Sequence, residues 1–183
     1  APPSSALRQY LRQFLSDRRV IDLNRVLWWL VLNLSVLPRR PRKSAALYRR
    51  IWTDEGSPLL VISRKQRAAL ERALETRLGD AVPVAIAMRY GNPSTEHAIG
   101  ELLDQGVDRV VALPMYPQYA SATTGSSLEE LFAVLGRMRV VPSVRVVPPY
   151  YDDPAYIGAL CSVILRALER ASFTPERIVI RIR

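Results

Sequence analysis

From residue 82 onward, the sequence alternates short apolar runs with longer segments of helical character. The apolar runs are rich in valine and isoleucine, which is typical of strands buried on both faces of a sheet. They cover residues 82–88, 109–115, 144–147 and 177–182. Because parallel strands are joined by long crossovers, usually helices, this alternation predicts an α/β protein. We expect a doubly wound parallel sheet in three α/β/α layers, of Rossmann-like or flavodoxin-like type.

Three helices are expected between these strands, over residues 94–105, 126–138 and 154–171. Ser126 and Glu129 have the S-x-x-E spacing of a capping box for the second helix. Asp153 and Pro154 supply an N-cap and a first-turn proline for the third. Cys161 lies in the apolar part of that third helix, and we expect a buried structural thiol there. As the single cysteine, it cannot form an internal disulfide.

The N-terminal third of the chain predicts helices of two kinds. Apolar side chains at helical spacing mark an amphipathic helix, namely Leu7, Tyr10, Leu11, Phe14 and Leu15. Residues 26–37 are apolar nearly all round and are followed by Arg39, Arg40, Arg42 and Lys43. One interpretation is an interfacial anchor with cations at lipid headgroups, and the other is a core helix followed by a basic loop. The run is too short to span a bilayer, so any membrane contact through residues 26–43 is expected to be peripheral.

Three loops that contain tyrosine follow the first three expected strands. Ligands of doubly wound sheets bind beyond the carboxyl ends of the strands, where these loops should converge. The candidate lining residues are Arg89, Tyr90, Tyr116, Gln118, Tyr119, Ser121, Thr123, Thr124, Ser126, Tyr150 and Tyr151. Tyrosine rings offer apolar faces and arginine pairs with carboxylate, so the loops indicate a pocket for a flat aromatic ligand with acidic edges. The alternative is that the tyrosines pack the sheet edge and the hydroxyls cap the loops.

The net charge of +9 favours an anionic partner, although a solvated basic surface is the alternative. A nucleic-acid-binding domain would fit the charge but would leave the tyrosine-rich loops unexplained. The sequence contains neither a G-x-G-x-x-G nor a G-x-x-x-x-G-K-[ST] motif, so a nucleotide phosphate cradle is not indicated. The only histidine, His97, follows Glu96 at the start of a polar helix and is expected at the surface.

The sequence resembles the ferrochelatases, enzymes that insert ferrous iron into protoporphyrin IX to make haem. The resemblance rests on five stretches in family order: "LRQYLRQFLSDRRVID", "YRRIWTDEGSPL", "AMRYGNPS", "LPMYPQYASATTGSS" and "PPYYDDPAYI". The YPQY-x-x-x-TTGS string, within residues 116–126, is highly specific. The resemblance implies a chelatase-like fold and a lyase that inserts Fe²⁺ into protoporphyrin IX or coproporphyrin III.

The same resemblance assigns site residues. For the porphyrin pocket these are Arg18, Arg19, Ser57, Arg89, Tyr90, Tyr116, Gln118, Tyr119, Thr123, Thr124 and Ser126. An apolar lip at the pocket mouth, facing the membrane, would comprise Trp28, Trp29, Leu30, Leu32, Leu34 and Leu37. Ala120, Ser121 and Ala122 stand where some members place a cysteine that ligates an iron–sulfur cluster. We therefore expect no cluster and no tightly bound cofactor, with iron as a substrate.

The family has two similar α/β halves, and this chain resembles mainly the first. Residues 1–150 are expected to form the first domain without its first strand, and residues 151–183 the crossover helix and first strand of the second. The family's metal-site histidine would fall near Arg183 and its glutamate further on, so we expect no catalytic or metal-binding residue here and no iron insertion by the chain alone. We expect a cytoplasmic protein that meets the inner face of the membrane peripherally and binds no nucleic acid. A non-catalytic tetrapyrrole- or haem-binding domain and a cobalt chelatase are the alternatives.

Overall fold

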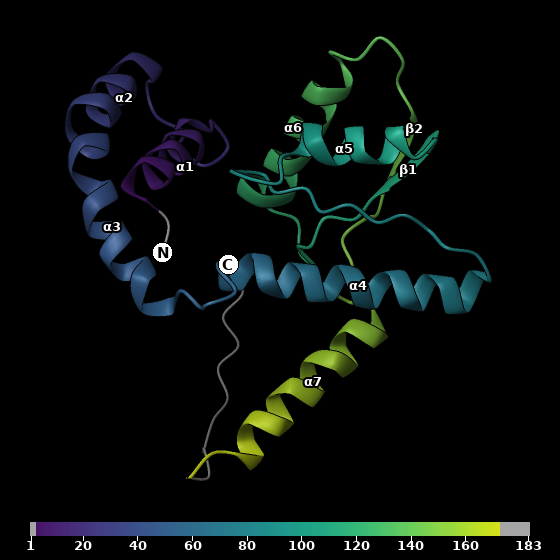
Figure 1. The fold of residues 1–183 in the computed structure, drawn as a ribbon. Coiled ribbons are helices and arrows are strands. Elements are labelled where there is room, and N and C mark those ends of the chain that lie inside the picture. Colours follow the sequence, from purple (N-terminus) through teal and green to yellow (C-terminus); the bar gives the residue numbers. More distant parts are fainter. Residues whose placement is uncertain (1–2, 173–183) are drawn as a thin grey trace.

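The computed structural model of the protein describes residues 3–172, most of which lie in helices (Figure 1). The predicted strand at residues 177–182 lies outside the described residues. In chain order the elements are α1 (Ser4–Ser16), α2 (Arg25–Val31), the π-helical turn η1 (Leu32–Val36), α3 (Leu37–Ile51), α4 (Pro58–Leu78), α5 (Thr95–Asp104), β1 (Arg109–Ala112), the π-helical turn η2 (Ser121–Gly125), α6 (Ser126–Leu135), β2 (Ser143–Val146) and α7 (Pro154–Glu169).

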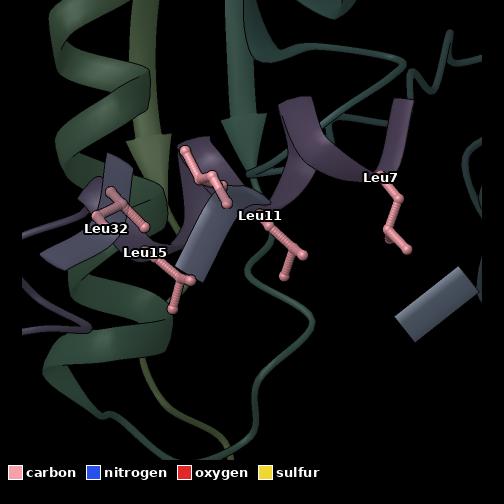
Figure 2. Packing of buried hydrophobic residues seen from close by; sticks show 5 residues of the cluster. Leu7, Leu11, Leu15 and Leu32 are labelled. Atoms are coloured by element: carbon pink, nitrogen blue, oxygen red, sulfur yellow. The ribbon is translucent and has the colours of Figure 1, made fainter. Parts of the chain in front are cut away.

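The N-terminal helices share one hydrophobic core, as the spacing of apolar residues predicts. Leu7, Leu11 and Leu15 recur every four residues on α1 and are 5%, 7% and 4% exposed. They pack with Leu32 and Leu37 of the following helical segment (Figure 2). This core fixes α1 against α3 and thereby places the chain that leaves α1 at Asp17.

The segments α2, η1 and α3 are consecutive, and the π-helical turn explains how their leucines reach the core. In η1 the Leu37 N–H donates to the Leu32 carbonyl, five residues earlier, as is characteristic of a π-helix. This bond brings the two side chains toward the same face, and both are buried. The basic loop expected after residue 37 is wrong, because α3 continues through Arg39, Arg40 and Pro41.

The apolar run at residues 26–37 is partly buried in the core and partly exposed at the surface. The buried part fits the core-helix interpretation, and the interfacial anchor stays a prediction. Leu32 and Leu37 are 3% and 1% exposed, whereas Trp29 and Leu34 are 61% and 71% exposed. Trp28 is half-buried, and its indole N–H donates to the Leu15 carbonyl at 2.7 Å. Among residues 3–172, no helix is both long enough and apolar enough to cross a bilayer.

A second hydrophobic core lies between α5, α6 and a two-stranded parallel sheet (Figure 1). Strands β1 and β2 are joined through α6, with Val110 opposite Val144. The buried members of this core are Ile99, Val110, Leu131 and Leu135. The parallel pairing and the helical crossover confirm the predicted α/β character of this part of the chain.

The predicted strand at residues 82–88 does not form in the described structure. Its single bridge joins Met88 to Ser94, and β1 itself stops at Ala112, before Pro114. An apolar run favours a strand, but a strand also needs a neighbour with free backbone groups, and no described segment forms a ladder with residues 82–87. The described sheet therefore contains two of the four predicted strands, not a complete doubly wound sheet.

The predicted cap of α7 is confirmed, whereas the capping box of α6 is wrong. Asp153 Oδ1 accepts hydrogen bonds from the N–H groups of Ala155 and Tyr156 at 2.8 and 3.2 Å. Ser126 is instead the first residue of α6, because η2 leads directly into this helix, and its hydroxyl makes tertiary contacts. Cys161, expected to be buried, is exposed, because α7 has no buried residue and lies apart from the described cores.

We predict that Leu32→Ala lowers the free energy of unfolding by about 2–5 kcal/mol, because it removes core contacts and leaves a cavity. Leu34→Ala is the matched control in the same π-helical turn, where the leucine is 71% exposed. It should change the free energy by less than about 0.5 kcal/mol. Urea unfolding followed by circular dichroism measures both, and equal losses would contradict this burial pattern.

Candidate functional site

One carboxylate oxygen of Asp17, the residue that follows α1, joins distant parts of the chain. Asp17 Oδ2 accepts hydrogen bonds from Arg89 Nη2 and the Tyr90 hydroxyl, each at 2.7 Å, and from the Ser126 hydroxyl. The other oxygen, Oδ1, accepts the backbone N–H of Arg19 at 2.8 Å. The Asp17 side chain is only 4% exposed, so these donors replace water around its charge. We call Asp17, Arg89, Tyr90 and Ser126 the Asp17 cluster.

The cluster changes the acidity of two of its members. Burial tends to raise the pKa of Asp17, but hydrogen bonds from Ser126, Tyr90 and the Arg19 N–H, together with the Arg89 charge, outweigh burial and hold this pKa below its usual value. Burial raises the pKa of the Tyr90 phenol to about 12, and both the hydrogen bond to Asp17 and the negative charge of Asp17 add to this increase. At neutral pH, Asp17 is therefore a carboxylate and Tyr90 a hydrogen-bond donor.

The guanidinium of Arg89 is engaged through all three of its nitrogens. Its Nε donates to the Ser126 carbonyl and hydroxyl oxygens at 2.9 and 2.6 Å, and Nη1 lies 3.4 Å from Glu130 Oε2. Its Cζ lies 4.6 Å from the centre of the Tyr90 ring, within cation–π range. Arg89 thus links the segment after residue 88 to the first turn of α6.

Aromatic contacts support the same junction from the side of α1. The Tyr90 ring meets Phe14 and Tyr10 edge-on, with centroid distances of 5.3 and 6.2 Å. The Gly91 N–H also donates to Gln13 Oε1 at 2.9 Å. Tyr10 and Phe14, which also border the leucine core, therefore pack α1 against the loop at residues 89–91.

The loop at residues 113–127 is anchored near its end and open in its middle. Ser126 is fully buried, whereas Tyr116 and Tyr119 are 40% and 59% exposed. Gly125 permits the close approach of two side chains, because a Cβ there would lie 3.1 Å from both Arg19 Nη1 and the Tyr119 hydroxyl. Two exposed tyrosine rings therefore extend from a firmly held base.

Arg19 holds the beginning of this anchor from the other side. Its Nε forms an ion pair with Glu129, and its Nη1 lies 3.4 Å from the Ser121 hydroxyl. The hydrogen bond to Glu129 raises the pKa of the Arg19 guanidinium. Glu129 is therefore an ion-pair partner and not part of a capping box. Arg18 is exposed, and no hydrogen bond or ion pair joins its side chain to the rest of residues 3–172.

The third tyrosine-bearing loop meets the second. The Tyr150 N–H donates to the Pro117 carbonyl at 3.0 Å, and the Tyr150 hydroxyl donates to the Pro114 carbonyl at 3.3 Å. Tyr151 is exposed beside it. Since Arg89 and Tyr90 bind Ser126, the predicted convergence of the three loops is confirmed.

The remaining predicted pocket residues occupy varied environments. Gln118 is half-buried, and the Thr123 hydroxyl donates to the Ala120 carbonyl at 3.3 Å. The Thr124 hydroxyl is buried and has no partner among the described residues. Ser57 directly precedes α4 and is not hydrogen-bonded to the Asp17 cluster.

A hollow of about 510 Å³ lies where α4 faces α5 and the segment before it, which includes Asn92 and Pro93 of the first tyrosine-bearing loop. Its lining residues are Leu60, Arg64, Arg67, Ile86, Asn92, Pro93, His97 and Glu101. Arg67 is neutralised there by Glu71 and Glu101, at 3.0 and 3.7 Å. None of the predicted pocket residues lines this hollow.

Asp17 is the functional candidate that sequence reasoning missed. Its partners Arg89, Tyr90 and Ser126 are 72, 73 and 109 residues away along the chain. No spacing of residues within a short stretch of sequence could therefore predict the cluster. The one local signal is an aspartate directly after the amphipathic helix and before two arginines, which resembles an ordinary helix end.

We predict that Asp17 makes stability depend on pH in the acid range. Because the pKa of Asp17 is lower in the folded state than its ordinary value of 3.8, its contribution is present above that value. The contribution is lost as the pH falls through the folded pKa. Asp17→Asn should therefore reduce stability at pH 7 and flatten its decline below about pH 4, as measured by denaturant unfolding. The control, Asp22→Asn, alters an exposed aspartate and should preserve the decline; an equally steep decline in Asp17→Asn would count against the cluster.

Comparison with known proteins identifies the family. The ferrochelatase family model matches residues 1–181. The chain is 47% identical over 179 residues to the ferrochelatase of Chromobacterium violaceum, covering 98% of this chain and 49% of that protein. It is 50% identical over 160 residues to that of Teredinibacter turnerae (87% and 44% covered) and 44% identical over 180 residues to ferrochelatase 2 of Shewanella oneidensis (98% and 54% covered). The chain spans about half the length of these curated relatives. Because the family model matches nearly the whole sequence, the chain belongs to the ferrochelatase family.

Proposed function

We propose that this chain supplies part of the porphyrin pocket of an enzyme that inserts ferrous iron into a porphyrin, protoporphyrin IX or coproporphyrin III, in haem biosynthesis. The relatives' name, ferrochelatase, supports the reaction. The structural observation that carries the proposal is the loop at residues 113–127, which is fixed at buried Ser126 and exposes Tyr116 and Tyr119.

This surface suits the chemistry of a porphyrin. The macrocycle is flat and apolar and carries carboxylates at one edge, and exposed tyrosine rings offer apolar faces of matching shape. Arg19 and Arg89 are already paired within the protein, so their role is to order the pocket wall. Arg18, the exposed residue that precedes Arg19 in the chain, is suited to pair with a ligand carboxylate.

Iron is a substrate of the proposed reaction, and its insertion requires a base that removes two pyrrole protons. The family resemblance assigns the base and metal-binding roles to a histidine and a glutamate that this chain does not match. His97 is exposed in the first turn of α5, with its backbone N–H bonded to the Ser94 hydroxyl, and lies in the separate hollow. We therefore propose that this chain contributes porphyrin binding, and that a longer protein supplies the groups for insertion.

We extend the proposal to the architecture and the location. The parallel β1–β2 pair with its α6 crossover supports a three-layer chelatase-like sheet in the whole protein. In this arrangement residues 1–150 belong to the first α/β domain, and residues 151–183 begin the second. The proposed location is the cytoplasm.

We predict that the chain binds protoporphyrin IX in a titration followed by its absorbance, and that Tyr119→Ala weakens binding about tenfold by removing a stacking surface. Phe132→Ala is the matched control, since Phe132 is 54% exposed on α6 and Tyr119 is 59% exposed on the loop. The control should bind as tightly as the wild type. If Tyr119→Ala and Phe132→Ala bind protoporphyrin IX with equal affinity, the loop is not part of the binding site.

We also propose that the exposed part of residues 26–40 contacts a membrane surface peripherally. Its apolar side chains Val26, Leu27, Trp29 and Leu34 are 61–72% exposed, and Arg39 and Arg40 are exposed one to two turns further along. Apolar side chains that enter the headgroup region beside cations are typical of interfacial segments. A porphyrin that partitions into lipid would then reach the pocket from the membrane.

We predict that the chain co-sediments with vesicles of phosphatidylcholine and phosphatidylglycerol, and that the double variant Trp29→Ser/Leu34→Ser largely abolishes this. Leu165→Ser is the control, because Leu165 is 58% exposed on α7 and lies outside the proposed contact. Added salt should weaken binding only partly, since the apolar contacts are not screened. Binding that is unaffected by the double variant would contradict the assignment.

A further inference from the structure

We propose that Asp17 is a positioning residue of the porphyrin pocket: it touches no ligand but sets the positions of Arg89, Tyr90 and Ser126. This inference rests on the proposed function. Asp17 would contact the residues that line the pocket and not the porphyrin.

The carboxylate of Asp17 is enclosed by its hydrogen-bond donors. One oxygen, Oδ2, accepts from three side chains, two of them at 2.7 Å, and the side chain is 4% exposed. A carboxylate enclosed in this way has no surface left for a porphyrin. Its influence on a ligand must therefore pass through its three donors.

The three donors come from different segments of the chain. Tyr90 packs against α1, Arg89 leaves the loop after residue 88, and Ser126 ends the loop that exposes the two tyrosines. Asp17 is thus the common acceptor for the segments that form the base of the pocket.

The direction of each hydrogen bond depends on a carboxylate at residue 17. The Ser126 hydroxyl donates to Asp17 and accepts from Arg89 Nε, so a carboxylate at residue 17 sets the orientation of this hydroxyl. An asparagine amide would place its NH2 group either against the three side-chain donors on Oδ2 or against the Arg19 N–H on Oδ1. In both orientations Arg89, 20% exposed, would keep only the more distant Glu130 as a charged partner. The shape is retained while the ion pair with Arg89 and at least one of the hydrogen bonds to residue 17 are lost.

The test compares Asp17→Asn with Asp22→Asn, an exposed aspartate five residues further on. Protoporphyrin IX affinity is measured by absorbance titration, with folding checked by circular dichroism. We expect about tenfold weaker binding for Asp17→Asn and no change for Asp22→Asn. Ser126→Ala removes one donor but keeps the Asp17–Arg89 ion pair, so it should fold and bind with intermediate affinity.

A second readout needs no porphyrin. In nitrogen-15 NMR spectra, the Arg89 Nε–H signal, assigned through Arg89→Lys, should be protected from solvent exchange in the wild type. In Asp17→Asn it should exchange faster or shift, because its acceptors are no longer held in place. A merely stabilising ion pair would change the unfolding free energy while leaving affinity in the folded variants untouched.

The outcomes separate this inference from the proposed function. If the wild type binds porphyrin and Asp17→Asn binds equally well, the positioning role is overturned and the proposed function stands. If the wild type does not bind porphyrin, the proposed pocket fails, and the role of Asp17 in it fails as well. An Arg89 signal that is identical in the wild type and Asp17→Asn would overturn the geometric basis of the inference.

Discussion

The described structure depends on one buried carboxylate at the junction of two hydrophobic cores. The leucine core of α1, η1 and α3 and the core of α5, β1 and α6 are separate clusters. Between them, Asp17 accepts hydrogen bonds from Arg89, Tyr90 and Ser126. A buried charge of this kind is tolerated only when it is fully paired, so the donors and the two cores must come together in one arrangement.

This junction explains why an open loop can still present a defined surface. Loops are ordinarily the mobile parts of a fold, but the loop at residues 113–127 ends at a fully buried serine and is flanked by the Arg19–Glu129 ion pair. The two tyrosines in its middle are exposed. The polar groups that hold the loop, such as the Ser126 hydroxyl and the Arg19 guanidinium, already have partners within the protein. The tyrosine rings therefore offer apolar faces to a ligand.

Local patterns in the sequence predict the parts of the fold that local physics determines. The four-residue spacing of Leu7, Leu11 and Leu15 predicts the core face of α1, and Asp153 predicts the start of α7. The strand pattern succeeds for β1 and β2 but fails at residues 82–88, where no described segment supplies ladder partners. The π-helical turn and the continuation of α3 through Pro41 also have no simple local signature.

The candidate site divides in the same way. Its residue types and the convergence of its loops follow from the order of strands and from the family resemblance, whereas Asp17 does not, since its partners are 72 or more residues away. Ser126 and Glu129 show the limit of motif reasoning, because their capping-box spacing is real but their side chains serve tertiary contacts instead. Long-range polar pairing becomes visible only once the cores place the segments together.

The central claim is that a porphyrin lies against the loop at residues 113–127. Nitrogen-15 NMR spectra of the chain with manganese protoporphyrin test this directly, because the paramagnetic metal broadens signals near the bound macrocycle. We expect selective loss of the backbone signals of Tyr116, Gln118 and Tyr119, with those of α7 unchanged. Broadening confined to the hollow around Arg64 and His97, or spread evenly over the chain, would contradict it.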